Sequence, residues 1–473
     1  MTPNILATRY ASDAMVSLWS PEAKVLRERK LWLCVLEAQR DLGVAIPAEA
    51  VEAFRANLSQ IDLASIAARE RITRHDVKAR IEEYCALAGY EHIHRGLTSR
   101  DVTENVEQTL VREALLLVQS KAAAALSRLT SLAEEFCEVP VAARTHNVVA
   151  QTSTLGKRFA TAGEELLESL KALDSLLERQ KLRGIKGAVG TQQDLLEMFD
   201  GDHTKVEELE RRVAAELGFE TCLGVVGQIY PRSIDAEVVS CLLYLVSGPA
   251  SLATTLRLMA GQGHSREGFA DEQVGSSAMP HKMNARLCER IGGLKIILGG
   301  HMAMAVELSG SQWNEGDVSC SVVRRVMLPD AFYTCDAILE TFISVLHSLE
   351  VFEDSLRDEI EANLLPLASS RLLAVVVDKG LGREEAHSIL RKHLATDLKA
   401  SQDMKARQGK ISRVANSLGA DTDFPMTAAE VKTLLAAPDT SAAQRQVQTF
   451  AAEARQYLNR FPQASQYLPA EIV

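Results

Sequence analysis

The strongest fold signal in this chain is the stretch VEQTLVREALLLVQSKAAAALSRLTSLAEEFCE, residues 106–138. Its apolar residues, from Val106 and Leu110 to Leu129 and Leu132, recur every three or four positions until Pro140 ends the pattern. This is the spacing of one face of an α-helix. Further segments keep the same period, and they cover residues 159–177, 235–259 with a kink at Gly248-Pro249, 286–308 and about 330–349. Helices of such length predict an all-α protein built on a long bundle.

Several of these helices are apolar on more than one side, which a single bundle cannot fully bury. We therefore expect copies of the chain to associate through them. Before the bundle, Ser20-Pro21 begins a helix, with the serine as N-cap and the proline at the first helical position. After about Ser355 the helical segments become shorter. The pattern predicts three parts: an N-terminal helical domain (1–104), a central long-helix domain (105–358) and a small C-terminal helical domain (359–473).

Composition narrows the class of protein. The chain has 473 residues, 5% aromatic residues and a net charge of -11, which argues against a nucleic-acid or anionic-membrane partner. Eight cysteines lie far apart with no C-x-x-C pair, as in a protein of a reducing compartment. We find no signal-peptide pattern and no uncharged run of membrane-spanning length. These features predict a cytoplasmic, soluble protein.

Residues 275–284, GSSAMPHKMN, interrupt the helical pattern with small and polar residues. Together with Gly261, Gly263 and Gly268 they form a stretch whose backbone changes conformation at low cost, as a lid requires. The helix that follows would turn its positive end, and Lys282, toward whatever the loop covers, so we expect an anionic ligand. The alternative is a solvated linker whose hydroxyls cap the next helix.

This loop, followed by Glu289 and Arg290, resembles the signature loop of the fumarase/aspartase superfamily, and it is most similar to that of the adenylosuccinate lyases. Other segments resemble the same family: Arg9-Tyr10, Arg74-His75-Asp76-Val77, Gly96-Leu97-Thr98-Ser99, Thr145-His146 with Gln151-Thr152, Gly227-Gln228, and Ser321 with Arg325. The resemblance implies a three-domain all-α fold and a homotetramer whose active sites combine residues of three chains. It covers nearly the whole chain.

The reaction implied by the resemblance is a β-elimination that releases fumarate from a succinyl nucleotide. It requires a base for the carbon-bound proton, donors for the charged carboxylate, and an acid for the departing nitrogen. The resemblance assigns Ser276 as the base, His146 as the acid, and Lys282, His75 and Glu289 as further catalytic residues. It assigns substrate binding to Arg9, Tyr10, Arg74, Asp76, His94, Thr98, Ser99, Thr145, Gln151, Gln228, Ser277, Met279, Asn284, Arg290, Ser321 and Arg325. No metal and no organic cofactor is expected.

Three local expectations accompany this assignment. Asp76 would orient the imidazole of His75. Asp101 would cap the next helix with Glu104 three positions later. The segment around His146, which follows Pro140, would be a loop.

Some alternatives stay open at the level of sequence. His92 and His94 form an H-x-H pair, but no third metal ligand follows at a suitable spacing. Gly316 stands where the family often has arginine, so phosphate binding would depend more on the other arginines. The superfamily also includes argininosuccinate lyases, aspartases, fumarases and cycloisomerases, and some relatives of this fold are non-catalytic scaffolds.

Overall fold

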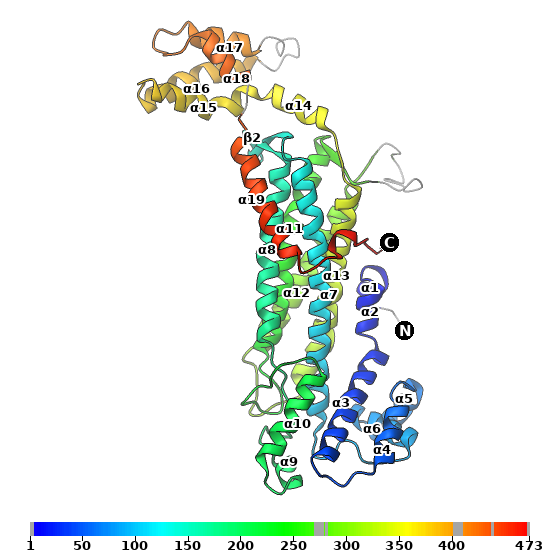
Figure 1. Cartoon of the computed structure of the whole chain (residues 1–473). Coiled ribbons are helices and arrows are strands. Elements are labelled where there is room, and N and C mark those ends of the chain that lie inside the picture. The colour runs from blue at the N-terminus through cyan, green and yellow to red at the C-terminus, as the bar shows by residue number, and fades with distance from the viewer. Residues whose placement is uncertain (1–3, 269–278, 280–281, 401–409, 437–438, 471–473) are drawn as a thin grey trace.

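The computed structural model describes residues 4–268, 279, 282–400, 410–436 and 439–470, and helices dominate it. Long helices run side by side in a central bundle (Figure 1): α7 (Ser99–Glu135), α8 (Leu155–Arg179), α11 (Ser233–Gly261), α12 (Arg286–Leu308) and α13 (Ser319–Ser348). The predicted all-α class and the long bundle are confirmed.

Most of these helices begin earlier than the sequence predicted. α7 starts at Ser99, and α13 starts at Ser319 instead of about Asp330. Pro329 lies inside α13, as Pro249 lies inside α11. Proline removes one helical hydrogen bond, and the extensive packing of both helices in the bundle outweighs this loss.

One apolar core runs along the bundle, and it includes Leu126, Leu166, Leu242 and Phe342, all fully buried. Burial of each such side chain stabilises the fold by about 1.5–3 kcal/mol. At one crossing α8 and α11 come close because Gly248 has no side chain. A Cβ at this position would lie 2.8 Å from the carbonyl oxygen of Ala162.

A second core forms where the N-terminal helices meet the start of α7. The N-terminal helices are α1 (Ile5–Arg9), α2 (Asp13–Leu18), α3 (Pro21–Asp41), α4 (Ala48–Ala56), α5 (Leu63–Thr73) and α6 (Asp76–Ala88). Of these, α3, α4 and α6 supply the second core, whereas Leu6 of α1 and Met15 of α2 join the core of the bundle, and Ile66 of α5 belongs to a small separate cluster. Ser20 caps α3 as predicted. Two helices that the predicted boundaries assigned to the central domain, α9 (Gln193–Met198) and α10 (His203–Glu216), also contribute to this second core.

The segment around His146 is a hairpin, so the expectation of a loop is wrong. β1 (Pro140–Thr145) pairs antiparallel with β2 (Val148–Thr154), with a register shift between Ala143 and Arg144. His146 and Asn147 form the turn with φ angles of 53° and 60°. Positive φ at both central residues matches the right-handed twist of a two-residue hairpin. A second small sheet pairs β3 (Ser265–Arg266) with β4 (Glu350–Val351).

The predicted C-terminal domain, residues 359–473, is split between two apolar cores. A third apolar core unites the helices α15 (Leu364–Asp378), α16 (Arg383–Ala400), α17 (Lys410–Gly419) and α18 (Ala428–Ala436), which α14 (Glu353–Ala362) connects to the bundle. The last helix, α19 (Ser441–Leu458), leaves this domain and packs along α7 and α8, followed by the short η2 (Ala464–Gln466) (Figure 1). Phe450 joins the core of the bundle, so residues 359–473 are not one unit.

Two bundle helices are long and apolar enough to cross a membrane, judged by length and composition alone, although the sequence had suggested no such run. In α11, 61% of the most apolar window is buried within the chain, whereas in α12 only 33% is buried. The outer face of α12 is therefore an exposed apolar surface.

Candidate active site

His75 and Ser99, which are 24 positions apart in sequence, meet at the start of α7. Nε2 of His75 lies 3.4 Å from Oγ of Ser99. His75 is the N-cap of α6, and its Nδ1 accepts a hydrogen bond from the Lys78 N–H at 3.2 Å. The nearest Asp76 oxygen is 3.8 Å from this nitrogen, so the backbone of Lys78, not Asp76, orients the ring. Because Nδ1 is an acceptor, the neutral ring carries its proton on Nε2, toward Ser99.

Asp76 instead joins the same site to α13. One of its carboxylate oxygens lies 3.1 Å from both Arg80 and Arg325. Burial by itself would raise the pKa of Asp76, but Arg80, a backbone N–H and Arg325 outweigh it and lower the pKa. Ser321 lies one turn before Arg325 on α13, and Arg74 lies exposed at the C-cap of α5. This end of the molecule thus collects most of the predicted residues from α6, α7 and α13.

Thr98 caps α7, and this corrects the expectation for Asp101. Asp101 is the third residue of the helix and accepts from the Thr98 N–H at 2.7 Å in a capping box. Its other oxygen accepts from Arg183 at 2.5 Å and from the Lys186 N–H at 2.9 Å. The buried Asp101 therefore holds the turn that presents Thr98 and Ser99.

His94 is partly buried beside Trp32 of the second core. Its Nδ1 accepts from Nε1 of Trp32 at 3.1 Å, and burial lowers its pKa to about 4. Only Nε2 remains for a ligand. In the part of the chain that the structure describes, no group of three or more metal-binding side chains is suitably arranged.

Arg9, Tyr10 and Arg290 come together between α1 and α12. The guanidinium carbons of Arg290 and Arg9 lie 5.5 Å and 6.0 Å from the centre of the Tyr10 ring. Burial lowers the pKa of Arg290, and the positive charges of Arg9 and Arg286 lower it further. Guanidinium groups that repel one another in this way form a site of positive potential for an anion.

Part of the signature loop lies outside the described residues, including Ser276 and Ser277. Among its described residues, the Lys282 N–H donates to the Met279 carbonyl at 3.0 Å. Both are exposed, whereas Asn284, two residues before α12, is partly buried. Glu289, in the first turn of α12, lies 3.5 Å from Arg257 of α11.

A carboxylate of the chain itself occupies the N-terminus of α12, where the sequence predicted an anionic ligand. The buried carboxylate of Glu267 accepts from the N–H groups of Leu287 at 3.0 Å and Cys288 at 2.7 Å. A side chain of the same chain therefore occupies the positive end of this helix. Lys282 remains as the cationic group that the loop offers to an anion.

His146 is exposed at the tip of the β1–β2 hairpin. Two arginines hold the hairpin that carries His146 in place. Arg144 forms an ion pair with Glu359 of α14, and Arg158 of α8 donates to the carbonyl of Ala142 at 3.1 Å. Thr145 precedes His146 in the turn and is exposed, and Gln151 donates to Oγ of Ser370 at 2.9 Å.

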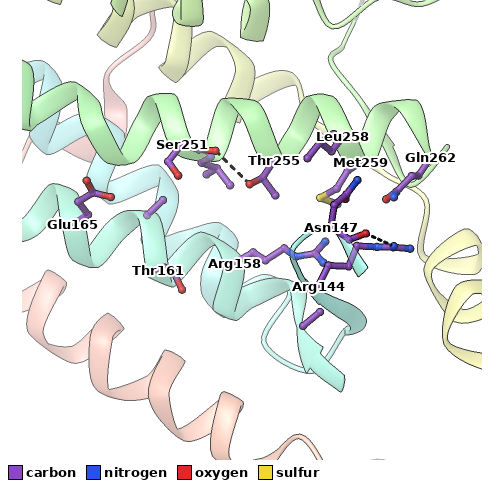
Figure 2. Close-up of a pocket in the computed structure, with 13 residues that line it drawn as sticks. Arg144, Asn147, Arg158, Thr161, Glu165, Ser251, Thr255, Leu258, Met259 and Gln262 are labelled. Atoms are coloured by element: carbon purple, nitrogen blue, oxygen red, sulfur yellow. Dashed lines mark hydrogen bonds between the residues drawn. The ribbon is translucent and has the colours of Figure 1, made fainter. Parts of the chain in front are cut away.

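A cavity of about 400 Å³ lies between this hairpin, α8 and α11 (Figure 2). Arg144 of the hairpin and Arg158 of α8 both line it, and Arg144 donates to the carbonyl of Asn147 at 3.2 Å. His146 itself is not among the lining residues. Both arginines donate hydrogen bonds to backbone carbonyl groups of the hairpin. The cavity therefore lies behind the part of the hairpin that these two side chains hold in place.

Ser99 and His146 lie at opposite ends of the bundle. Ser99 is the first residue of α7, and the hairpin follows the end of that helix (Figure 1). A helix of 37 residues is roughly 55 Å long. One chain therefore cannot bring His146 to the same ligand as His75 and Ser99.

The predicted contact residue Gln228 packs against the loop that contains Gly316. Its N–H donates to the carbonyl of Glu315 at 2.7 Å, and a Cβ on Gly316 would lie 3.1 Å from its own Cβ. The sequence suggested that a cation is missing here. Arg100, which sequence reasoning missed, donates to the carbonyl of Asp317 at 3.3 Å and places a guanidinium beside this loop. Its position directly after Ser99 was the available signal.

Sequence reasoning also missed Arg324, which is buried between three helices. Its guanidinium lies 2.7 Å from Asp235 of α11 and 2.6 Å from Glu107 of α7. Nearby, the buried Arg232 and Glu104 pair at 2.7 Å. These ion pairs fix the relative positions of the helix ends that carry Ser99 and Arg325. The signal for Arg324 was a charged residue beside Arg325 in an apolar helical phase.

Comparisons with known proteins identify the family to which this chain belongs. The profile of a protein family described as Lyase matches residues 22–296, more than half of the chain. The adenylosuccinate lyase of Saccharomyces cerevisiae is 36% identical over 393 residues, which cover 82% of this chain and 81% of the relative. That of Schistosoma mansoni is 33% identical and covers 82% of each chain. The chain belongs to the adenylosuccinate lyase family. The resemblance seen in the signature loop is thereby confirmed.

Solved structures show how widely the fold of this adenylosuccinate lyase family member is shared. The 3-carboxy-cis,cis-muconate lactonizing enzyme from Pseudomonas putida superposes with a TM-score of 0.79 at 18% identity and covers 96% of this chain and 100% of its own. A fumarate lyase from Mesorhizobium sp. BNC1 gives 0.77 at 20% identity, covering 94% and 98%. At these identities the likeness concerns the fold alone.

Proposed function

We propose that this chain catalyses the β-elimination of fumarate from adenylosuccinate, which gives AMP, and from the succinyl-aminoimidazole carboxamide ribotide, which gives AICAR. The observation that carries the proposal is the 36% identity to an adenylosuccinate lyase over 82% of the chain. The arrangement of Arg9, Tyr10 and Arg290 supports it, because a nucleotide substrate requires a cationic site for its phosphate.

The phosphate end of the substrate would bind far from the reacting bond. Arg9 and Arg290 supply charge, Tyr10 supplies an aromatic surface between them, and Ser321 with Arg325 offers a second set of donors on α13. Binding energy from such a remote group positions the succinyl part for reaction. The way in which chains associate determines which of these phosphate contacts belong to the same chain.

At the reacting end, Ser276 would remove the proton from carbon. A serine hydroxyl is a very weak base unless its ionised form is stabilised, and Lys282 is the cation in the same loop. Lys282, Asn284, Thr98 and Ser99 would hold the carboxylate that gains charge, and each well-placed donor of this kind contributes roughly 10²–10³ in rate.

His146 would donate a proton to the departing nitrogen, a contribution of about 10²–10⁴ in rate. His75 presents its Nε2 toward Ser99, which fits a role beside the carboxylate. Glu289 would influence charge near the loop. The remaining predicted contacts, namely Arg74, Asp76, His94, Thr145, Gln151, Gln228, Ser277 and Met279, stay assigned to substrate binding. No metal or organic cofactor enters the proposed reaction.

We further propose that the working form is a homotetramer with active sites shared between chains. The outer face of α12 exposes Ile296, Ile297, Met304 and Val306. On the same helix Gly292, Gly293, Gly299 and Gly300 each face open space, so another helix can approach closely. Association through this face would supply His146 of one chain to the Ser99 end of another. A cytoplasmic location is proposed because the chain carries eight free cysteines, and no nucleic-acid or membrane partner is proposed.

The proposal is tested by following absorbance during incubation of the purified protein with adenylosuccinate, argininosuccinate or malate. Cleavage of adenylosuccinate alone is expected. Ser276→Ala should abolish turnover while AMP binding, measured by calorimetry, stays close to that of the unaltered protein. Turnover of argininosuccinate or malate in place of adenylosuccinate would contradict the substrate, and normal turnover by Ser276→Ala would contradict the base.

A further inference from the structure

A buried charge cluster lies between α7 and α13, away from the residues proposed for catalysis. Lys121 of α7 is 2% exposed, and Asp336 and Glu340 of α13 are completely buried. Nζ of Lys121 forms an ion pair with Asp336 and lies 2.6 Å from Glu340. One lysine thus faces two carboxyl groups in the core, where burial raises the pKa of Asp336 and where polar groups are costly unless they are fully hydrogen-bonded.

The N-terminal segment supplies part of the missing hydrogen bonds. The Ser12 N–H donates to the second oxygen of Asp336 at 2.7 Å, and Nζ of Lys121 donates to Oγ of Ser12 at 2.7 Å. Ser12 is also the N-cap of α2. A second anchor lies at the start of α1, where Asn4 donates to Asp330 of α13 at 2.7 Å.

Arg9 and Tyr10 lie between these two anchors. Tyr10 precedes Ser12 by two residues, a stretch of chain that spans at most about 7 Å. The position of Ser12 on the charge cluster therefore determines how closely Tyr10 can lie to Arg290 on α12, now 5.5 Å from its ring centre.

The C-terminal segment supplies further hydrogen bonds to the cluster, at Glu340. The Tyr467 hydroxyl donates to one oxygen of Glu340, and the Ala470 N–H donates to the other at 2.8 Å. These contacts satisfy the carboxylate that Ser12 does not reach. Residues near the N-terminus and residues near the C-terminus thus contact the same buried cluster around Lys121.

We propose that Lys121, Asp336, Glu340 and Tyr467 are positioning residues that hold the Arg9-Tyr10 segment at its phosphate-binding place. None of these four residues is among those proposed to bind substrate. The cluster acts through Ser12, and the contacts of Tyr467 and Ala470 with Glu340 keep Lys121 in place for Ser12. The part of the proposal that concerns phosphate rests on the proposed function, whereas the coupling between the two chain ends does not.

Two mild substitutions test the coupling. Ser12→Ala removes the hydroxyl that Lys121 contacts, and Tyr467→Phe removes one hydrogen bond to Glu340 while leaving the ring. Ser20→Ala is the matched control, because Ser20 caps α3 through the Ala23 N–H at 3.1 Å but lies outside the cluster. Ser12→Thr, which retains a hydroxyl, serves as the rescue.

Hydrogen–deuterium exchange of residues 5–18 is the direct measurement. Ser12→Ala and Tyr467→Phe should each raise exchange in this segment about fivefold, the loss expected for one cap or buried hydrogen bond. Ser20→Ala and Ser12→Thr should leave it at the level of the unaltered protein. Unchanged exchange in Tyr467→Phe would overturn the coupling between the chain ends.

Kinetics with adenylosuccinate then separate positioning from general destabilisation. KM should rise about fivefold in Ser12→Ala and Tyr467→Phe with kcat within about twofold, because the group affected binds substrate without entering the reaction. Faster exchange with an unchanged KM would overturn the positioning role. If the unaltered protein does not cleave adenylosuccinate, the proposed function fails, and the exchange result alone decides the coupling.

Discussion

Single residues of the proposed site depend on unusual backbone positions. His146 has φ of 53° and His94 has φ of 65°, in the left-handed region that most residues avoid and that asparagine tolerates. The turn at His146 holds the imidazole exposed at the end of the hairpin, away from the body of its own chain. A residue substituted at these positions must tolerate a positive φ. Otherwise the change in backbone conformation obscures the chemical effect of the substitution.

For this reason we choose His146→Asn to test the proposed acid. Asparagine keeps the turn and removes the proton donor, so kcat should fall about 10²–10⁴-fold, while KM should stay within about threefold. Steady-state kinetics with adenylosuccinate measure both constants. Asn147→Gly is the control, because it alters the same turn without the imidazole and should retain near-normal activity. A variant His146→Asn with normal kcat and only a raised KM would contradict the assignment.

His94 makes stability depend on pH. Burial lowers its pKa from 6.5 to about 4, so below pH 6.5 the unfolded chain binds a proton that the folded chain does not. Its contribution is therefore fully present above pH 6.5 and is lost as the pH falls toward 4, by about 2–3 kcal/mol. Urea unfolding at pH 7 and pH 4.5, at equal protein concentration, measures this loss.

His94→Asn should flatten that pH dependence, since it removes the titrating group. The exposed His203 at the start of α10 gives the control His203→Asn, which should keep the slope of the unaltered protein. An equal pH dependence in His94→Asn and the unaltered protein would show that His94 is not responsible.

At the scale of elements, close packing lets helices continue where local rules predict an end. Pro249 and Pro329 both lie inside long helices. Glu267, from the segment after α11, occupies the N-terminus of α12 and replaces the ligand that the helix would otherwise attract. At the start of α12, a side chain about twenty residues earlier in the sequence thus satisfies groups that the helix itself leaves unbonded.

Gly248 permits the contact between α8 and α11, and Gly248→Ala tests it. The new Cβ would lie 2.8 Å from a backbone oxygen, which cannot move without shifting the helix, so unfolding free energy should fall by about 1–3 kcal/mol. Gly261→Ala is the control on the same helix, because nothing lies within 4 Å of its added Cβ. It should be neutral or stabilising by about 0.5–1 kcal/mol. Thermal unfolding of both variants gives the comparison, and equal effects would argue against the contact.

At the scale of the whole molecule, the bundle separates the proposed catalytic groups. His75 and Ser99 lie at one end of α7, and His146 lies beyond the other (Figure 1). The exposed apolar face of α12 offers the surface through which a second chain can complete the site. Activity should therefore belong to the assembly and not to one chain.

Complementation between two inactive variants tests this directly. His75→Asn keeps an N-cap on α6, and His146→Asn keeps the hairpin turn, so both variants should fold. Each should be inactive alone, and a mixture that has been dissociated and reassociated should regain part of the activity, because some sites then contain both histidines. Native mass spectrometry confirms that mixed oligomers form. Mixed oligomers without activity would contradict shared sites.

Much of the structure of this protein is determined by local sequence patterns, and these features can be predicted from the sequence alone. The apolar period of residues 106–138 predicts the bundle, Ser20-Pro21 predicts a helix start, and the signature loop with Arg290 predicts the family. The resemblance also assigns Arg9, Tyr10 and Arg290 to substrate binding, and their side chains are close in the structure. Each of these signals depends on residues a few positions apart or on a recurring motif.

Other features exist only because distant segments meet. The docking of α19 on the bundle, the carboxylate of Glu267 on α12 and the cluster at Lys121 all join residues far apart in sequence. Helical periodicity describes one face of one element, and it carries no information about which partner covers that face. The hairpin at His146 depends on two residues with positive φ, a conformation that the pairing of β1 with β2 stabilises. The separation of His146 from Ser99 follows from the length of a rigid helix, and only the folded chain places both at its ends.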